Sequence, residues 1–435
     1  MRAASYPGSP SPSIGLGTMS VVAAPVASAK EKPAEAGKIT LSKPLMESAV
    51  KIQDAVKAKD WAAAKQLLLA AQPSVSSEDD KYWFAQQQLN VGIQLKDPAM
   101  QRPGIEGVLA SGKANPADLP ALEFYAGQFA LQAKEYDPAI AHLTKATQLN
   151  YPGSSAYLLL AEAHFQKATA AGTNMSPENR AIAAKGVPYI KQAIEAEKAA
   201  GKPVPPEWVA RGFSFASVLG LPDAPEWSMM NLRAAPTGQN WRAAIITYQN
   251  GHKDLTRGEN LDLSRLLYAT NGLTSPNDYG EYADAALKSG VLGEVIKGIE
   301  KGRSSGVLSG TQLADYYSQA QSQVARDKAD LPAAERDAAK AANGAAAVAT
   351  GDALMGYGEY AKAVTLYNLA LTKGGVDADE VNSRLGIALT QSGDMAGAKA
   401  AFAKVTKPNR KAIANFWTVY IDTKSGAAAP ATTGQ

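Results

Sequence analysis

Cysteine is absent from the 435 residues, and only three histidines occur. Without cysteine the chain has no disulfide, no thiolate metal ligand, no cysteine nucleophile and no lipidated cysteine. The histidines, His142, His164 and His252, are scattered, with no pair at i, i+4 and no adjacent set of carboxylates. Histidine-based metal sites need such spacing. We therefore expect no metal site and no cofactor.

The sequence also lacks an excess of positive or negative charge, and it lacks a long run of apolar residues. The chain has 44 basic and 41 acidic residues, a net charge of +3, and no block of like charge. Because neutralising phosphates requires a basic stripe, nucleic acid is not expected as the main partner. A transmembrane helix needs about 20 consecutive apolar residues. No such run occurs, so no membrane span is expected.

The N-terminal stretch carries an export pattern. Residues Ile14–Val26 are apolar and rich in small side chains, and they are followed by Ala27-Ser28-Ala29 and then Lys30. A short apolar region ending in A-x-A is typical of a secretory signal peptide. We expect residues 1–29 to be a signal peptide cleaved after Ala29, which predicts a periplasmic or secreted protein. A disordered tail is the alternative interpretation of the same composition.

One spaced pattern recurs along the chain. It reads large-x-x-Ala-x-x-x-large-x-x-apolar and occurs at Tyr360–Ala370 and at Met395–Val405, with Ala363 and Ala398 lying 35 positions apart. Offsets of three, four and three place these residues on one helical face. The alanine lets a paired helix approach closely, and the large residues fill the gap between the helices. Such a hairpin must stack on neighbours to bury its apolar face.

This pattern resembles the tetratricopeptide repeat, a helix–turn–helix unit of about 34 residues. Related patterns occur at Trp61–Ala71, Tyr136–Ala146, Trp241–Gly251 and Leu292–Gly302. The resemblance implies an all-α fold, an α-solenoid of tetratricopeptide-like hairpins forming a right-handed superhelix. It also implies a non-enzymatic scaffold that binds a protein or peptide partner in its concave groove.

Composition and the positions of proline and glycine suggest how the chain is divided into repeats. Residues Pro98, Pro103 and Gly104 are expected to break the chain within a degenerate second unit, and Leu331-Pro332 is expected to split an atypical hairpin into two helices. The expected segments are a linker at 30–44, N-terminal repeats at 45–200, degenerate and repeat-like helices at 201–309, the atypical hairpin at 310–343, C-terminal repeats at 344–424 and a disordered tail at 425–435.

Groove residues follow from the resemblance. In this family the first helix of each hairpin lines the concave side. Polar amides with interspersed apolar residues suit an extended peptide, and Phe124 is expected as an apolar anchor. The positions implied as partner-binding are Phe124, Gln128, Gln132, Glu162, Gln166, Asp352, Met355, Arg384 and Gln391.

Two short motifs suggest enzymatic chemistry but lack its context. Gly302–Gly306 matches G-x-S-x-G, yet a nucleophile elbow needs a preceding strand and a later histidine, and all three histidines come earlier. Gly107–Lys113 resembles a phosphate-binding loop, but Ala114 occupies the position of the Mg²⁺-binding Ser or Thr. We expect no catalytic residue. A cryptic hydrolase or cell-wall enzyme and a self-assembling structural element remain as alternatives, and the oligomeric state is left open.

Overall fold

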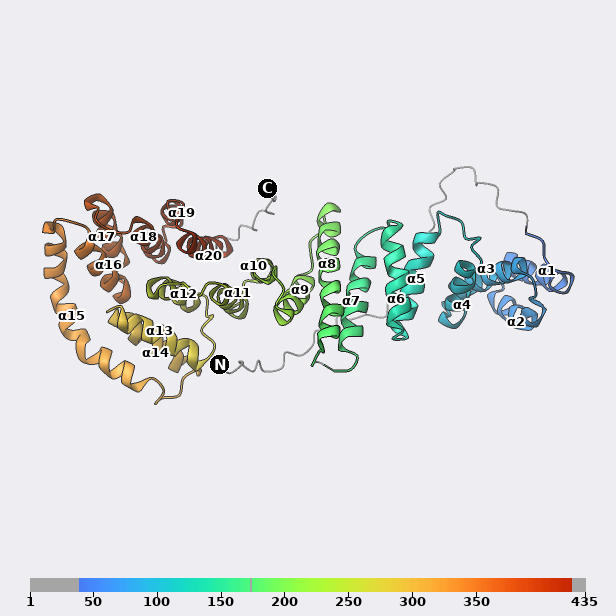
Figure 1. The fold of residues 1–435 in the computed structure, drawn as a ribbon, viewed down its shortest axis with the longest axis horizontal. Coiled ribbons are helices and arrows are strands. Elements are labelled where there is room, and N and C mark those ends of the chain that lie inside the picture. Colours follow the sequence, from blue (N-terminus) through green and yellow to red (C-terminus); the bar gives the residue numbers. More distant parts are fainter. Residues whose placement is uncertain (1–38, 173, 425–435) are drawn as a thin grey trace. The chain divides into compact units, whose positions relative to one another are not determined.

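The computed structural model describes residues 39–172 and 174–424. Within these ranges the chain forms 20 α-helices and no β-strand (Figure 1). The all-α prediction is therefore confirmed. The chain divides into two compact units, unit 1 ending at Leu221 and unit 2 beginning at Pro222. The expected signal peptide, its cleavage after Ala29 and the expected tail at 425–435 lie outside the described residues.

Unit 1 is a series of antiparallel helical hairpins. The pairs α1–α2, α3–α4, α5–α6 and α7–α8 each pack along their length, and α9 follows α8. The helices are α1 Lys43–Lys57, α2 Trp61–Ala71, α3 Glu78–Leu95, α4 Pro98–Ala110, α5 Leu119–Gln132, α6 Tyr136–Gln148, α7 Ser155–Thr169, α8 Pro177–Ala199 and α9 Pro206–Leu219.

Unit 2 contains further hairpins, α13–α14, α16–α17 and α18–α19, together with a long helix, α15. Its helices are α10 Ala224–Ala234, α11 Gly238–Gly251, α12 Arg257–Ala269, α13 Pro276–Lys288, α14 Leu292–Ser304, α15 Ala314–Lys340, α16 Ala345–Tyr357, α17 Tyr360–Lys373, α18 Ala378–Ser392, α19 Met395–Phe402 and α20 Pro408–Lys424.

The recurring alanine of the sequence pattern is buried in each of four hairpins. Ala64, Ala139, Ala363 and Ala398 have no exposed surface. A glycine on the first helix completes the contact, because a side chain there would overlap a large residue 16 positions later on the second helix. The glycine pairs are Gly127 with Leu143, Gly351 with Tyr367 and Gly386 with Phe402. The same register in three hairpins shows that the sequence pattern encodes one repeated packing geometry.

Helix α4 does not break where its prolines suggested. It runs through Pro103, and Pro98 stands in its first turn, where a missing backbone N–H costs nothing. A side chain at Gly104 would overlap the backbone of Leu89, and one at Gly92 would overlap Gln101. The glycines therefore bring α3 and α4 into backbone contact, and this packing compensates for the hydrogen bond that Pro103 cannot donate.

The expected hairpin at 310–343 is a single helix, α15, with Pro332 inside it. Its two halves are held by different hairpins. The Tyr316 hydroxyl donates to Asp284 of α13 at 3.2 Å, whereas Glu335 pairs with Lys362 of α17 at 3.3 Å. Because both ends are anchored, α15 spans the two hairpins in spite of its proline.

The end of the expected linker is also ordered. The backbone N–H of Ser42 donates to Asp80 at 2.8 Å, and the Asp80 carboxylate also accepts from Ser76 and Ser77. Asp80 has no exposed surface, and although burial opposes it, these hydrogen bonds lower the pKa of its carboxyl. One buried carboxylate thus attaches the start of α1 to the start of α3.

Candidate binding site

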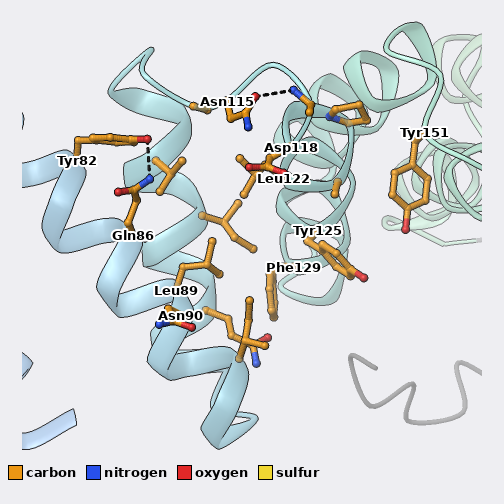
Figure 2. A pocket seen from close by; sticks show the side chains of 18 of the residues that line it. Tyr82, Gln86, Leu89, Asn90, Asn115, Asp118, Leu122, Tyr125, Phe129 and Tyr151 are labelled. Carbon is orange, nitrogen blue, oxygen red and sulfur yellow. Dashed lines mark hydrogen bonds between the residues drawn. The ribbon is translucent and has the colours of Figure 1, made fainter. Parts of the chain in front are cut away.

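A cavity of about 650 Å³ lies within unit 1, between the α3–α4 hairpin and α5. The loop from Ser111 to Asp118 and the turn at Asn150–Pro152 complete its walls. Figure 2 shows Leu89 of α3 and Phe129 of α5 facing one another across it. Its floor and sides are apolar or aromatic: Tyr82, Leu89, Ile93, Ile105, Val108, Leu122, Tyr125, Phe129 and Tyr151.

The polar lining of the cavity is almost uncharged. It consists of the amides Gln86, Asn90, Gln101, Asn115 and Asn150, and Asp118 is the only charged residue among the described lining residues. Gln101 is used internally, because its Nε2 donates to the Gly92 carbonyl at 2.9 Å. The Asn90 side chain makes no hydrogen bond within the described part of the chain, so it is free to pair with a ligand.

Phe124, the expected anchor, packs behind the cavity wall. It is only 6% exposed and stacks on Tyr151 with ring centroids 4.1 Å apart. Tyr151 itself lines the cavity, and burial raises the pKa of its hydroxyl to about 12. Phe124 therefore positions a cavity residue and is not available as an anchor, and the Tyr151 hydroxyl stays neutral at physiological pH.

Gln128 and Gln132 lie on the same helix as Tyr125 and Phe129, beside the cavity. Gln128 is half-buried and Gln132 is exposed. Neither side chain forms a hydrogen bond to another described residue. Both amides therefore remain available to a partner on α5, which keeps the prediction for these two residues open.

Glu162 and Gln166 do come together, in a cluster that also contains Arg211 of α9. The Gln166 Nε2 donates to Glu162 at 3.0 Å, and Arg211 Nη2 donates to the other Glu162 oxygen at 3.1 Å. The Arg211 guanidinium also lies 4.9 Å from the centre of the Phe215 ring. Glu162 therefore links α7 to α9, and Gln166 holds the Glu162 carboxylate from the same helix, roles that the sequence did not predict.

Asp352 and Arg384 meet in unit 2. Arg384 Nη1 donates to Asp352 at 2.7 Å, and its Nη2 pairs with Glu380 at 2.6 Å. Arg384 is buried. Their helices α16 and α18 are the first helices of their hairpins, as expected, but the two side chains bind one another and are closed off from a partner.

The pair belongs to a longer buried arrangement. Arg410 of α20 pairs with Glu380 at 3.1 Å and with Asp262 of α12 at 2.5 Å. Arg265 pairs with Asp262 at 2.6 Å and with Glu294 at 2.9 Å. We call this arrangement the arginine–carboxylate chain; its members are Asp352, Arg384, Glu380, Arg410, Asp262, Arg265 and Glu294.

Tyrosines end the arginine–carboxylate chain on both sides. Tyr367 donates to Asp352 at 2.6 Å, and Tyr282 donates to Glu294 at 3.1 Å. Burial, and then the neighbouring carboxylate, raise the pKa of each tyrosine well above its ordinary value. Burial also raises the pKa of Asp352, against the opposing effect of Arg384. The tyrosines therefore stay protonated and act as fixed donors.

The remaining two predicted groove residues, Met355 and Gln391, do not lie together with other predicted binding residues. Met355 is buried, and its Sδ lies 3.9 Å from the Tyr367 hydroxyl. Gln391 is exposed near the end of α18. Met355 is thus a core residue of the α16–α17 hairpin, and Gln391 is a surface residue without a described partner group.

Each of the three histidines contacts other residues of the fold. His142 Nδ1 lies 2.6 Å from Glu123, and His252 Nδ1 lies 2.9 Å from the Tyr248 carbonyl. His164 is buried against Tyr189, and burial lowers its pKa. Among the described residues, no group of three or more His, Asp or Glu is placed to hold a metal ion. No described helix combines the length and hydrophobicity needed to cross a bilayer.

The repeated register of buried alanine, glycine and large apolar residue defines the class of fold. The described residues form an α-solenoid of tetratricopeptide-like helical hairpins. The superhelical sense of the array stays a prediction.

Solved structures similar to this chain include tetratricopeptide-repeat proteins. One comes from Parabacteroides merdae, with 13% identity, 80% of this chain and 100% of that chain covered, and a TM-score of 0.25. The tetratricopeptide domain of P58(IPK) has 12% identity, coverages of 88% and 99%, and a TM-score of 0.22. Yeast Tom70 has 10% identity, coverages of 89% and 97%, and a TM-score of 0.21. No protein-family model and no curated protein matches the sequence.

Proposed function

We propose that the chain is a non-enzymatic scaffold that holds a protein or peptide partner, and that the partner binds at the unit 1 cavity. The observation that carries the proposal is the open apolar cavity between α3–α4 and α5. Protein interiors are packed almost without voids, and contiguous apolar surface left open in a soluble domain marks a contact site. In unit 2 the predicted groove residues Asp352 and Arg384 are already paired with one another, and so are the neighbouring Asp262 and Arg410.

The proposed partner segment carries large apolar side chains and little charge. A cavity of about 650 Å³ has room for more than one such side chain. Burying each Leu- or Phe-sized group contributes about 1.5–3 kcal/mol. Around the apolar floor stand amides, which can donate and accept, and a single carboxylate, Asp118. A basic residue at the end of the segment near Asp118 would complement that charge.

The spacing of the amides supports an extended partner. Gln86 and Asn90 are four residues apart on α3, and so are Gln128 and Gln132 on α5. Four residues of helix rise about 6 Å. Alternate residues of an extended chain repeat every 6.4–6.8 Å or so. Each amide pair can therefore reach successive main-chain groups on one side of an extended segment. Gln86 does so through its carbonyl oxygen and its second N–H, because its Nε2 already donates to the Tyr82 hydroxyl at 2.6 Å.

Leu89→Glu is expected to weaken partner binding at the cavity strongly. The new carboxylate would have to be buried against an apolar segment, which is costly when it is unpaired. A phage-displayed library of random peptides is first selected on the wild-type chain. The enriched peptides are then synthesised and their affinity measured by fluorescence anisotropy. We expect a loss of at least about tenfold, equivalent to about 1.4 kcal/mol.

The matched control is Leu69→Glu, the same substitution at an exposed leucine of unit 1 that does not line the cavity. It should leave the affinity unchanged, and circular dichroism should show both variants folded. If no peptide is enriched, or if enriched peptides bind Leu89→Glu as tightly as wild type, the cavity is not the binding site.

We also propose that the protein is exported, on the basis of Ile14–Val26 and the following Ala27-Ser28-Ala29. Protein purified from its native host is expected to begin at Lys30 when its N-terminus is sequenced. A mature chain that begins at Met1 or Arg2 would contradict export by this route.

A further inference from the structure

Within the described part of unit 2, helix α20 packs against helices that lie far from it in the sequence. It contacts its chain neighbours α18 and α19, and it also contacts α12. In Figure 1 α20 lies at the end of the red series, close to the α11–α12 region. Hydrogen bonds join residues 148 to 161 positions apart, among them Arg410 to Asp262 and Tyr248 to Asn409. In a solenoid each repeat normally contacts only its neighbours.

The contact is specified by charge. Arg410 is buried, and its guanidinium meets carboxylates from two different helices, Asp262 of α12 and Glu380 of α18. A third carboxylate, Glu259, lies 3.8 Å away. A side chain at Gly258 would crowd the Arg410, Arg384 and Glu380 head groups, so α12 leaves space for them. Before α20 packs against α12 and α18, Asp262, Glu380 and Glu259 have no ion pair with Arg410.

Apolar and aromatic groups complete the contact. Trp417 has no exposed surface, and its Nε1 donates to the Asp262 carbonyl at 3.3 Å. Phe416 packs edge-on against Tyr248, and Tyr420 packs edge-on against Trp241. The face that α20 presents therefore reads Arg410, Ile413, Trp417 and Tyr420, with helical offsets of three, four and three.

We propose that the surface formed by α11, α12 and α18 is a receptor for an amphipathic helix, and that α20 is its intramolecular occupant. The partner chemistry is defined by α20 itself: an arginine in the first turn, followed by large apolar or aromatic residues on one face. Helix-in-groove recognition uses anchors at this spacing. A helix of this pattern on another chain competes with α20 for the surface. The inference concerns unit 2 and is independent of the proposed function of unit 1.

The test uses the full chain and a fluorescein-labelled synthetic peptide of residues 407–424. Arg410→Ala in the full chain weakens its own α20, so the peptide, which retains Arg410, should bind this variant at least tenfold more tightly than it binds wild type. Lys411→Ala is the matched control, because Lys411 is an exposed cation one position further along α20. It should behave as wild type. A peptide carrying Arg410→Ala should lose its affinity for the Arg410→Ala chain.

Hydrogen exchange measured by mass spectrometry separates a displaceable helix from a fixed core helix. In the Arg410→Ala chain, exchange should rise in 408–424 and in the facing parts of α12 and α18, while the rest of unit 2 stays protected. If α20 stays fully protected and no peptide binds, the proposal fails. It fails equally if all of unit 2 loses protection together, because α20 is then an inseparable part of the core.

Discussion

Ala398→Glu is expected to unfold the C-terminal hairpins of unit 2. Ala398 has no exposed surface and lies in the core cluster that includes Phe402 and Ile413. Glutamate at this position adds volume where none is free and buries a carboxylate without a partner. Destabilisation above about 4–5 kcal/mol is exceptional for one substitution and comes from such mechanisms. We expect an effect of that size.

The control for Ala398→Glu is Ala400→Glu, the same change two positions further along α19 at an exposed residue. It should stay within about 0.5 kcal/mol of wild type. Hydrogen exchange along the chain provides the measurement, because it reports on residues 222–424 separately from unit 1. Normal protection of α18 and α19 in Ala398→Glu would mean that the assigned repeat register is wrong.

Asp262→Ala should have the second large effect. The Asp262 carboxylate has no exposed surface, and each of its oxygens accepts from a different arginine, Arg265 at 2.6 Å and Arg410 at 2.5 Å. Removing one partner of a buried ion pair costs about 3–5 kcal/mol, because an uncompensated charge is left behind. Here two guanidinium groups lose a partner, so we expect at least that loss of stability in unit 2.

The comparison for Asp262→Ala is Asp330→Ala, which removes an exposed aspartate of α15 that lies 3.7 Å from Arg326. An exposed pair contributes about 1 kcal/mol or less. Urea unfolding followed by hydrogen exchange should therefore show a large shift for Asp262→Ala and almost none for Asp330→Ala. Equal midpoints for the two variants would show that the arginine–carboxylate chain does not hold unit 2 together.

The repeat packing could be predicted from the sequence because it is local. The contact between Gly386 and Phe402 spans 16 residues and recurs in two other hairpins. Alanine spacing of three and four then suffices to assign the buried face. Proline was misleading in α4 and α15, because packing against neighbouring helices outweighed the loss of one hydrogen bond at Pro103 and Pro332.

The candidate site was harder to predict because it depends on how hairpins meet. Phe124 has the composition of an anchor, but the position of Tyr151 decides that it packs inward. The cavity arises beside α4, in the unit that looked degenerate, where Gly104 crowds Leu89. Clustered glycine and proline in one repeat was the available indication that its packing departs from the others.

The pairing of Asp352 with Arg384 follows from neighbouring first helices, and both residues were named from the sequence. Arg410 could not be placed in the same way. Its partner Asp262 is 148 residues earlier, and no periodic pattern connects positions so far apart. A lone arginine in a helix is ordinarily a solvated residue, so its burial between two carboxylates becomes visible only in three dimensions.

The separation of Asp262 from Arg410 also has a consequence for biosynthesis. Ribosomes add about 5–20 residues per second, so the 148 residues between them take about 7–30 s to make. Throughout that interval unit 2 contains a carboxylate without its second arginine. A chain that stops before α20 never acquires that arginine. We expect such truncated products to be degraded by proteases faster than chains that contain α20.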